Sequence, residues 1–209
     1  KNFEKIYEEI SYYLKITNSK IKTILFHDIK DFKSKKNRAI IFKLIKILKK
    51  DKKIYKFGVS LYKPKDLKFL LRYWVPDLVQ IPISPLNTEF HDCGYLNLLK
   101  KKKIEIHARS IFLQGLLINK KKIIPKKLRG EIKNIIKWKK FCAKNNLSSL
   151  EGCINFVRNF KQISGAVLGI DNLNHLIEIK NLLTKEKKKI NFNIKVSKKS
   201  LMLDARKWV

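Results

Sequence analysis

The feature that most constrains this chain is a regular alternation of amphipathic segments with short β-branched segments. Hydrophobic residues recur every three or four positions through Phe3–Leu14 and predict a helix. The next apolar segment, Ile21–Phe26, is rich in β-branched residues and too short for a helix, so it predicts a buried strand. The same pattern recurs along the chain and predicts further strands at Ile54–Ser60, Leu78–Pro82, Ile104–Ala108 and Ala166–Leu168.

Helical periodicity separates these strands. It predicts helices at Ile40–Leu48, Pro64–Leu71, Tyr95–Leu99, Ile132–Cys142, Leu150–Phe160 and Leu173–Leu182. Because a strand, a crossover helix and a second strand form a parallel pair, the alternation predicts an α/β fold with a parallel sheet. The glycine motifs of dinucleotide-binding Rossmann domains and of phosphate-binding loops are both missing, which weighs against those two folds.

Polar residues stand at the carboxyl ends of the predicted strands. They are His27, Ser60, Gln80, the pair Arg109–Ser110 and the segment Gly169–Asp171. In a (β/α)8 barrel the carboxyl ends of the strands form the active-site face. The pattern therefore favours part of such a barrel over a doubly wound sheet.

The net charge of +32 points first to nucleic acid, but its composition weakens that interpretation. Only six of the 49 basic residues are arginine, the residue that makes bidentate phosphate and base contacts. Lysine, isoleucine and asparagine share A/T-rich codons, so a low-GC genome accounts for the excess. The runs Lys100–Lys103, Lys120–Lys122 and Lys187–Lys189 fall where helix ends and loops are expected. We therefore expect a solvated basic surface and no specific nucleic-acid site, with non-specific adhesion to polyanions at low salt.

Several other classes of protein are disfavoured. No apolar run approaches the roughly 20 residues of a membrane span, and the first segment mixes glutamate and lysine unlike a signal peptide. Cys93, Cys142 and Cys153 lack the spacing of a disulfide framework or zinc site and predict reduced thiols in the cytoplasm. The four histidines also lack metal-ligand spacing, so no metal is expected.

Five short segments resemble successive strands of the aldo-keto reductase family. Thr23–Asp28 (TILFHD) resembles the fourth strand with its active-site histidine, and Phe57–Tyr62 (FGVSLY) resembles the fifth. Asp77–Ser84 (DLVQIPIS) is similar to the sixth strand, and Ala108–Leu117 (ARSIFLQGLL) to the seventh strand and its cofactor loop. Val167–Leu176 (VLGIDNLNHL) is similar to the eighth strand and the adenosine-side helix. The order holds from about residue 3 to about residue 183, which implies a partial TIM (β/α)8 barrel containing strands four to eight.

This resemblance implies hydride transfer from NADPH, or NADH, to the carbonyl of a small molecule such as an aldehyde, ketone or sugar, without a metal. His27 matches the histidine that polarises or orients the carbonyl, although a strand-end histidine can also simply satisfy a backbone group. The other matched positions are expected to bind the cofactor. Ser60 and Gln80 would hold the carboxamide, Arg109 would stack on the nicotinamide, Ser110, Phe112 and Gln114 would line the pyrophosphate side, and Gly169, Asp171, His175 and Glu178 would line the adenosine side.

The chain departs from the family pattern at several of these positions. Leu61 replaces the asparagine that commonly follows the matched serine, and His175 stands where an arginine is frequent. Gly169–Asp171 lacks the lysine or arginine that members often use for the 2′-phosphate of NADP. Asp171 would favour NADH if it lay near the ribose, but Asp171–Asn172 is also typical of a helix N-cap.

The resemblance also leaves out most of the catalytic tetrad. Its aspartate, tyrosine and lysine belong to the first three strands of the family, and Tyr12 and Tyr13 lie on a predicted helix instead. We expect residues 1–184 to form the partial barrel and residues 185–209 to form a tail near the barrel mouth, with Trp208 as a packing anchor. The intact parent is expected to be a monomer or weak oligomer. A catalytically dead remnant, or a lysine-rich module that binds polyanions, are the alternatives.

The 209-residue chain alone is therefore expected not to reduce an aldehyde with NADPH, because it presents no matched proton donor. The measurement is loss of NADPH absorbance in the presence of excess aldehyde. Turnover above the rate without protein would contradict the expectation.

Overall fold

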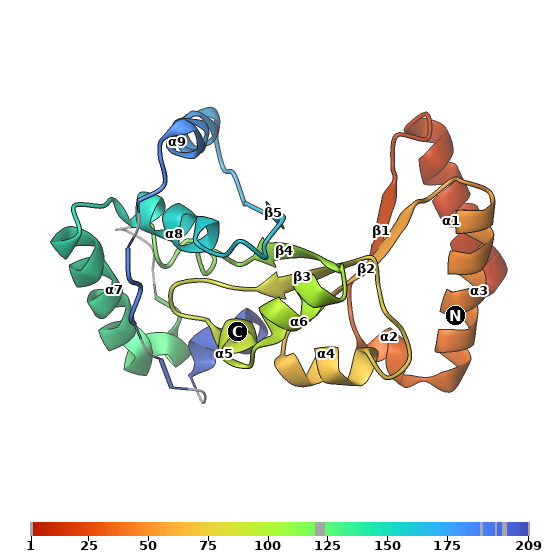
Figure 1. Ribbon diagram of the computed structural model, residues 1–209, viewed down its shortest axis with the longest axis horizontal. Coiled ribbons are helices and arrows are strands. Elements are labelled where there is room, and N and C mark those ends of the chain that lie inside the picture. The colour runs from red at the N-terminus through yellow and green to blue at the C-terminus, as the bar shows by residue number, and fades with distance from the viewer. Residues whose placement is uncertain (1, 120–123, 189, 195, 198–199, 209) are drawn as a thin grey trace. The chain divides into compact units, whose positions relative to one another are not determined.

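The computed structural model describes residues 2–119, 124–188, 190–194, 196–197 and 200–208. Lys120–Lys122 and Lys189, which belong to the predicted solvated lysine runs, lie outside these residues. The strands β1 (Thr23–Phe26), β2 (Lys56–Ser60), β3 (Leu78–Pro82), β4 (Glu105–Arg109) and β5 (Gly165–Ala166) form one sheet in that order. The predicted α/β fold with parallel strands is thus confirmed for the described residues (Figure 1).

The helices follow the predicted alternation, with longer bounds in most cases. They are α1 (Phe3–Ile16), α3 (Lys35–Lys50), α4 (Pro64–Leu70), α6 (Tyr95–Lys101), α7 (Ile132–Lys144), α8 (Ser149–Arg158) and α9 (Leu173–Thr184). The sequence pattern did not predict α2 (Lys30–Lys33), α5 (Glu89–Asp92) or the 3-10 turns η1 (Lys126–Glu131), η2 (Leu201–Leu203) and η3 (Ala205–Lys207). Such one-turn elements are too short to produce a hydrophobic period.

The last strand differs from the prediction of Ala166–Leu168. It is Gly165–Ala166, paired in parallel with His107 and Ala108 of β4. The Val167 amide donates one more bond to the Ala108 carbonyl at 2.8 Å. Beyond it, exposed Val167 and Gly169 lead to α9 without regular strand structure, so the predicted strand extends too far toward the carboxyl end.

Residue contacts group the chain into two units, and the first comprises residues 1–80 and 102–105. Its core lies between α1, α3 and the first two strands, which Figure 1 shows at the red and orange end of the chain. Leu14, Leu44, Leu48, Ile54 and Phe57 form the buried cluster. The helical spacing of the leucines explains this packing, since each helix turns one apolar face to the strands.

The β2–β3 pair is held by a close approach of the two backbones and by an aspartate side chain. Gly58 pairs with Leu78, and a Cβ added at Gly58 would lie 2.6 Å from the Leu78 carbonyl oxygen, so only glycine allows this approach. Asp77, which directly precedes β3, contacts both β2 and α3. Its Oδ2 accepts a hydrogen bond from the Phe57 amide of β2 at 2.8 Å and forms an ion pair with Lys49 Nζ of α3 at 2.7 Å. These contacts fix the register of β2 against β3.

The second unit comprises residues 81–101 and 106–209. Helices α7 and α8 pack tightly because Gly152 faces the fully buried Trp138, and a Cβ there would approach the indole to 2.8 Å. Phe192 of the C-terminal segment adds to this core, with its ring 5.2 Å from that of Phe156 and 5.4 Å from that of Phe141.

The end of the chain continues along the same unit. The Trp208 indole donates to the Leu201 carbonyl at 2.8 Å, and the Asn87 side chain donates to the Leu203 carbonyl at 3.2 Å. Trp208 is therefore buried and anchored, as one interpretation of the sequence proposed. The position of residues 185–209 near a barrel mouth stays a prediction.

Replacing Asp77 with alanine is expected to lower the free energy of unfolding by about 1.5–3 kcal/mol, because the Phe57 amide loses a charged acceptor. The matched control is Lys49→Met, which removes the half-exposed ion pair but leaves the amide bond, and should cost less than about 1 kcal/mol. Urea unfolding monitored by circular dichroism measures both. Equal losses in the two variants would show that the ion pair, not the backbone contact, carries the stability.

Candidate functional site

In the first unit, three predicted site residues stand at the carboxyl ends of adjacent strands. Ser60 of β2 is the register partner of Gln80 of β3. His27 follows Phe26 directly, and the register partner of Phe26 is Val59, the residue before Ser60. Parallel pairing therefore places His27, Ser60 and Gln80 on one row, and register partners on neighbouring strands point to the same face of a sheet.

The environments along this row differ. Ser60 is buried, Gln80 is half-buried and His27 is exposed. Leu61, the departure from the family pattern, is fully buried and its amide donates to the Gln80 carbonyl at 2.9 Å. Its side chain therefore belongs to the hydrophobic core, and its backbone extends the β2–β3 pairing.

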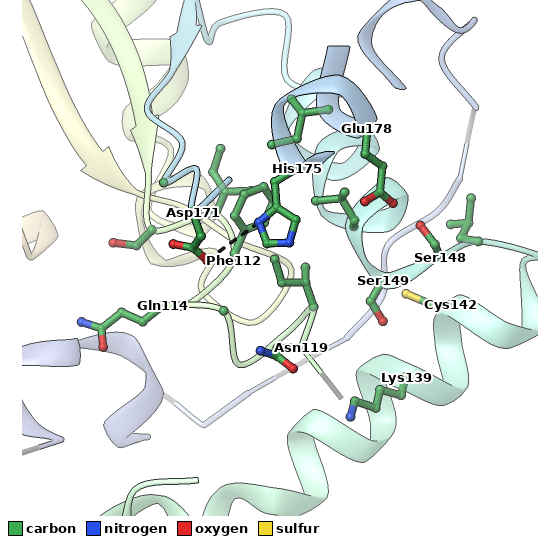
Figure 2. Close-up of a pocket in the computed structure, with 18 of the residues that line it drawn as sticks. Phe112, Gln114, Asn119, Lys139, Cys142, Ser148, Ser149, Asp171, His175 and Glu178 are labelled. Carbon is green, nitrogen blue, oxygen red and sulfur yellow. Dashed lines mark ion pairs between the residues drawn. The ribbon is translucent and has the colours of Figure 1, made fainter. Parts of the chain in front are cut away.

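The second unit contains a cavity of about 1030 Å³ built from four segments. They are the loop after β4, one face of α7, the turn that begins α8, and the segment from Val167 through α9. Figure 2 shows side chains from these segments directed toward a common space. The lining residues of this cavity are Ser110, Ile111, Phe112, Gln114, Gly115, Ile118, Asn119, Lys139, Cys142, Ala143, Leu147, Ser148, Ser149, Leu150, Val167, Gly169, Asp171, His175, Glu178 and Ile179.

The loop after β4 has an unusual backbone. Ser110, Leu113 and Gln114 have φ values of 57°, 46° and 52°, in the left-handed region that L-residues rarely adopt. Such conformations cost about 1 kcal/mol or more each and cluster at ligand-binding sites. Bonds from the Leu113 amide to the Ser110 carbonyl (3.0 Å) and from the Leu117 amide to the Phe112 carbonyl (3.2 Å) hold the turn.

Helix α9 supplies the opposite wall. Asn172 is its N-cap, accepting from the His175 amide at 2.9 Å, so the cap predicted at Asp171–Asn172 belongs to the asparagine. The His175 Nδ1 lies 3.8 Å from Asp171 Oδ2 (Figure 2, dashed), a weak pair because the Asp171 side chain is 89% exposed. His175, Glu178 and Ile179 line the cavity at i, i+3 and i+4, as residues of one helix face do.

Helices α7 and α8 supply residues that the sequence analysis did not single out for this site: Lys139, Cys142, Ser148 and Ser149. Burial raises the pKa of the Cys142 thiol to about 12, although a hydrogen bond from Ser149 acts against this, so the cavity wall carries a neutral thiol. The spacing of Lys139, Cys142 and Ala143 shows from the sequence alone that they share one helix face. It does not show that this face lines a cavity.

The cavity brings together seven of the predicted cofactor-binding residues: Ser110, Phe112, Gln114, Gly169, Asp171, His175 and Glu178. Arg109 does not line it; this residue precedes Ser110 at the end of β4, and its Nη1 donates to the Ser110 hydroxyl at 3.3 Å. Within the described residues, histidine, cysteine, aspartate and glutamate form no group of three that would hold a metal ion. No helix in the described part of the chain is long and apolar enough to cross a membrane.

Parallel strands joined by helices, with polar residues gathered at strand ends and in the loops that follow, define an α/β protein whose fold matches TIM-barrel enzymes. The sequence profile of the Aldo/keto reductase family matches residues 1–196, and the chain belongs to that family. No curated protein sequence matches the chain.

Solved structures with this fold include an aldo-keto reductase from Bacillus halodurans in its holo form, at a TM-score of 0.73 and 12% identity. The match covers 90% of this chain and 64% of the Bacillus enzyme, so the chain spans somewhat less than two thirds of its length. A glycerol dehydrogenase from Gluconobacter oxydans is similar at a TM-score of 0.58 and 15% identity, covering 91% and 67% of the two chains. An aldo-keto reductase from a Medee basin deep-sea metagenome gives 0.55 and 17%, covering 92% and 70%.

The buried thiols lead to a test of the cavity wall. At about pH 8 only the exposed Cys93 is expected to react with a coloured thiol reagent, because burial keeps Cys142 and Cys153 protonated and shielded. Two or more fast-reacting thiols in the folded protein would contradict this arrangement.

The raised pKa of Cys142 also predicts how stability depends on pH. Above about pH 8.5 the free energy of unfolding should fall, since the unfolded chain releases the Cys142 proton first and the folded chain holds it to about pH 12.

Proposed function

We propose that this chain forms the cofactor-binding part of an enzyme that reduces a carbonyl with NADPH, with NADH as the weaker alternative. In this proposal its strands correspond to strands four to eight of the family barrel. The observation that supports it best is the cavity of the second unit, where seven residues predicted from the resemblance line one space. These residues come from two separate segments, 110–114 and 169–178, and the pairing of β4 with β5 brings the two segments together.

The cavity suits a nucleotide in size and lining. Its volume of about 1030 Å³ is at the upper end of the range of small-molecule sites. Phe112, Val167 and Ile179 offer apolar surface for an adenine ring, and Ser110 and Gln114 offer hydrogen-bonding groups for a diphosphate. The strained backbone of Ser110 and Gln114 is consistent with a loop shaped to fit a ligand.

The reduced nicotinamide, when bound, supplies the hydride that a carbonyl carbon accepts. In the proposed assignment Ser60 and Gln80 hydrogen-bond the carboxamide and so select the face of the ring, while Arg109 stacks on it. His27 orients the carbonyl oxygen, for which its exposed position at the end of β1 leaves it accessible. We assign the proton donor to a tyrosine outside the matched strands, so the inactivity of the 209-residue chain alone remains part of the proposal.

The substrate class is a small aldehyde, ketone or sugar-type carbonyl. A lysine-rich module that binds polyanions is the competing function, and helix α7 gives it some support because its five lysines have no acidic residue among them. A polyanion module would bind NADPH and unrelated polyphosphates alike, and salt would abolish both.

The test is a cavity-filling variant, Gly169→Phe. Gly169 lines the cavity, and a Cβ added there meets open space, so the phenyl ring should block the nucleotide without disturbing the fold. We expect NADPH binding, measured by the change in its fluorescence, to weaken about tenfold or more. The matched control is Gly130→Phe, because Gly130 has equally open surroundings but does not line the cavity.

Unchanged NADPH affinity in Gly169→Phe would place the nucleotide elsewhere. Binding that survives in both variants and is competed equally by inorganic polyphosphate would favour the polyanion interpretation. Circular dichroism melting of each variant checks that the fold is retained.

A further inference from the structure

One charged residue that lines the cavity does not belong to the segments that resemble the family. Lys139 of α7 lines the cavity together with Cys142 and Ala143, one turn further along the same face of the helix. It is half-buried, unlike its neighbour Lys140, which is exposed. Figure 2 shows its side chain at the margin of the space that His175 and Asn119 border.

Among the residues that the structure describes, no carboxylate forms an ion pair with this lysine. Helix α7 (IKNIIKWKKFCAK) contains no acidic residue, so Lys139 lacks a partner at i±3 or i±4. Within the described part of the chain, Lys139 takes part in no ion pair or hydrogen bond. The carboxylates of Asp171 and Glu178 line the same cavity, but neither forms an ion pair with Lys139. A half-buried ammonium that has no ion-pair partner favours an anionic ligand, because the ligand would replace the missing partner.

The opposite wall lacks the cation that the resemblance led us to expect. Gly169, Ile170 and Asp171 provide no lysine or arginine for a 2′-phosphate, and the His175 Nδ1 on this wall lies 3.8 Å from Asp171 Oδ2. Lys139 is the one lysine or arginine among the described residues that line the cavity. It comes from a different segment of the chain, the helix that follows the β4 loop.

We propose that Lys139 binds the 2′-phosphate of NADPH and thereby sets the preference of this chain for NADPH over NADH. The inference rests on the proposed function and adds its specificity-determining residue. A phosphate monoester carries a charge of about −1.5 to −2, whereas the corresponding group of NADH is a neutral hydroxyl, so an unpaired ammonium distinguishes the two. Lysine binds phosphate as a point charge, which a flexible side chain in a wide cavity can provide.

A hydroxyl elsewhere on the cavity wall is compatible with this assignment. The Ser148 hydroxyl, which also lines the cavity, accepts a bond from the Glu151 amide at 3.1 Å and retains its own proton for donation. Asp171 opposes the assignment electrostatically, because a carboxylate near the ribose would favour the 2′-hydroxyl of NADH. The two residues therefore predict opposite preferences, and a measurement can separate them.

The experiment compares the dissociation constants of NADPH and NADH, measured by nucleotide fluorescence, for the wild-type chain, Lys139→Met and Lys140→Met. The wild-type chain should bind NADPH more tightly. Lys139→Met should weaken NADPH about 10- to 100-fold, the value of one charge-assisted bond, and leave NADH within about twofold. Lys140→Met has the same change in charge on the exposed side of α7 and should alter neither.

Each of the following results would overturn the inference. Equal weakening of both nucleotides in Lys139→Met would place the lysine at the shared diphosphate, and an unchanged NADPH affinity would remove it from the site. A wild-type preference for NADH that Asp171→Asn reverses would assign specificity to the carboxylate. If the wild-type chain binds NADH alone or with equal strength, the specificity inference fails while the proposed function stands; if it binds neither nucleotide, both fail.

Discussion

The close approach of β2 to β3 is the constraint on which the first unit depends. Gly58 lies so near the Leu78 carbonyl that no side chain fits there. Asp77, the residue before β3, accepts a hydrogen bond from the Phe57 amide of β2. Together these two contacts fix a parallel register in which Ser60 and Gln80 are partners on neighbouring strands. Because parallel strands end at the same edge of a sheet, this register places His27, Ser60 and Gln80 at the carboxyl ends of the strands, the edge where barrel enzymes bind their ligands.

In the second unit the corresponding constraint is the packing of α7 on α8. Gly152 allows Trp138 to be fully buried, and Phe192 of the C-terminal segment closes the aromatic cluster. This packing turns the 139, 142, 143 face of α7 toward the loop after β4 and toward α9. The cavity is therefore a product of helix packing, and Lys139 is positioned by a hydrophobic core.

Composition alone gave a misleading impression of the role of charge. Most of the lysines lie on exposed surfaces, as the run Lys100–Lys103 at the end of α6 does. Some exposed lysines form ion pairs: Lys188 contacts Glu151 at 3.0 Å and Lys49 contacts Asp77. Whether a lysine can bind a ligand depends on its burial and on whether it has an ion-pair partner. The net charge of +32 gives information on neither.

The sequence by itself determined the alternation of helices and strands, the family and seven residues of the cavity, because periodicity and short motifs are local properties. It overestimated β5, whose length depends on pairing with β4, and it missed the one-turn helices. Only the tertiary structure decided that Lys139 and Cys142 line the same space as His175 and that Leu61 belongs to the core. The physical reason is that a helix face acquires its role from what packs opposite it, and the spacing of residues along one helix carries no information about that partner.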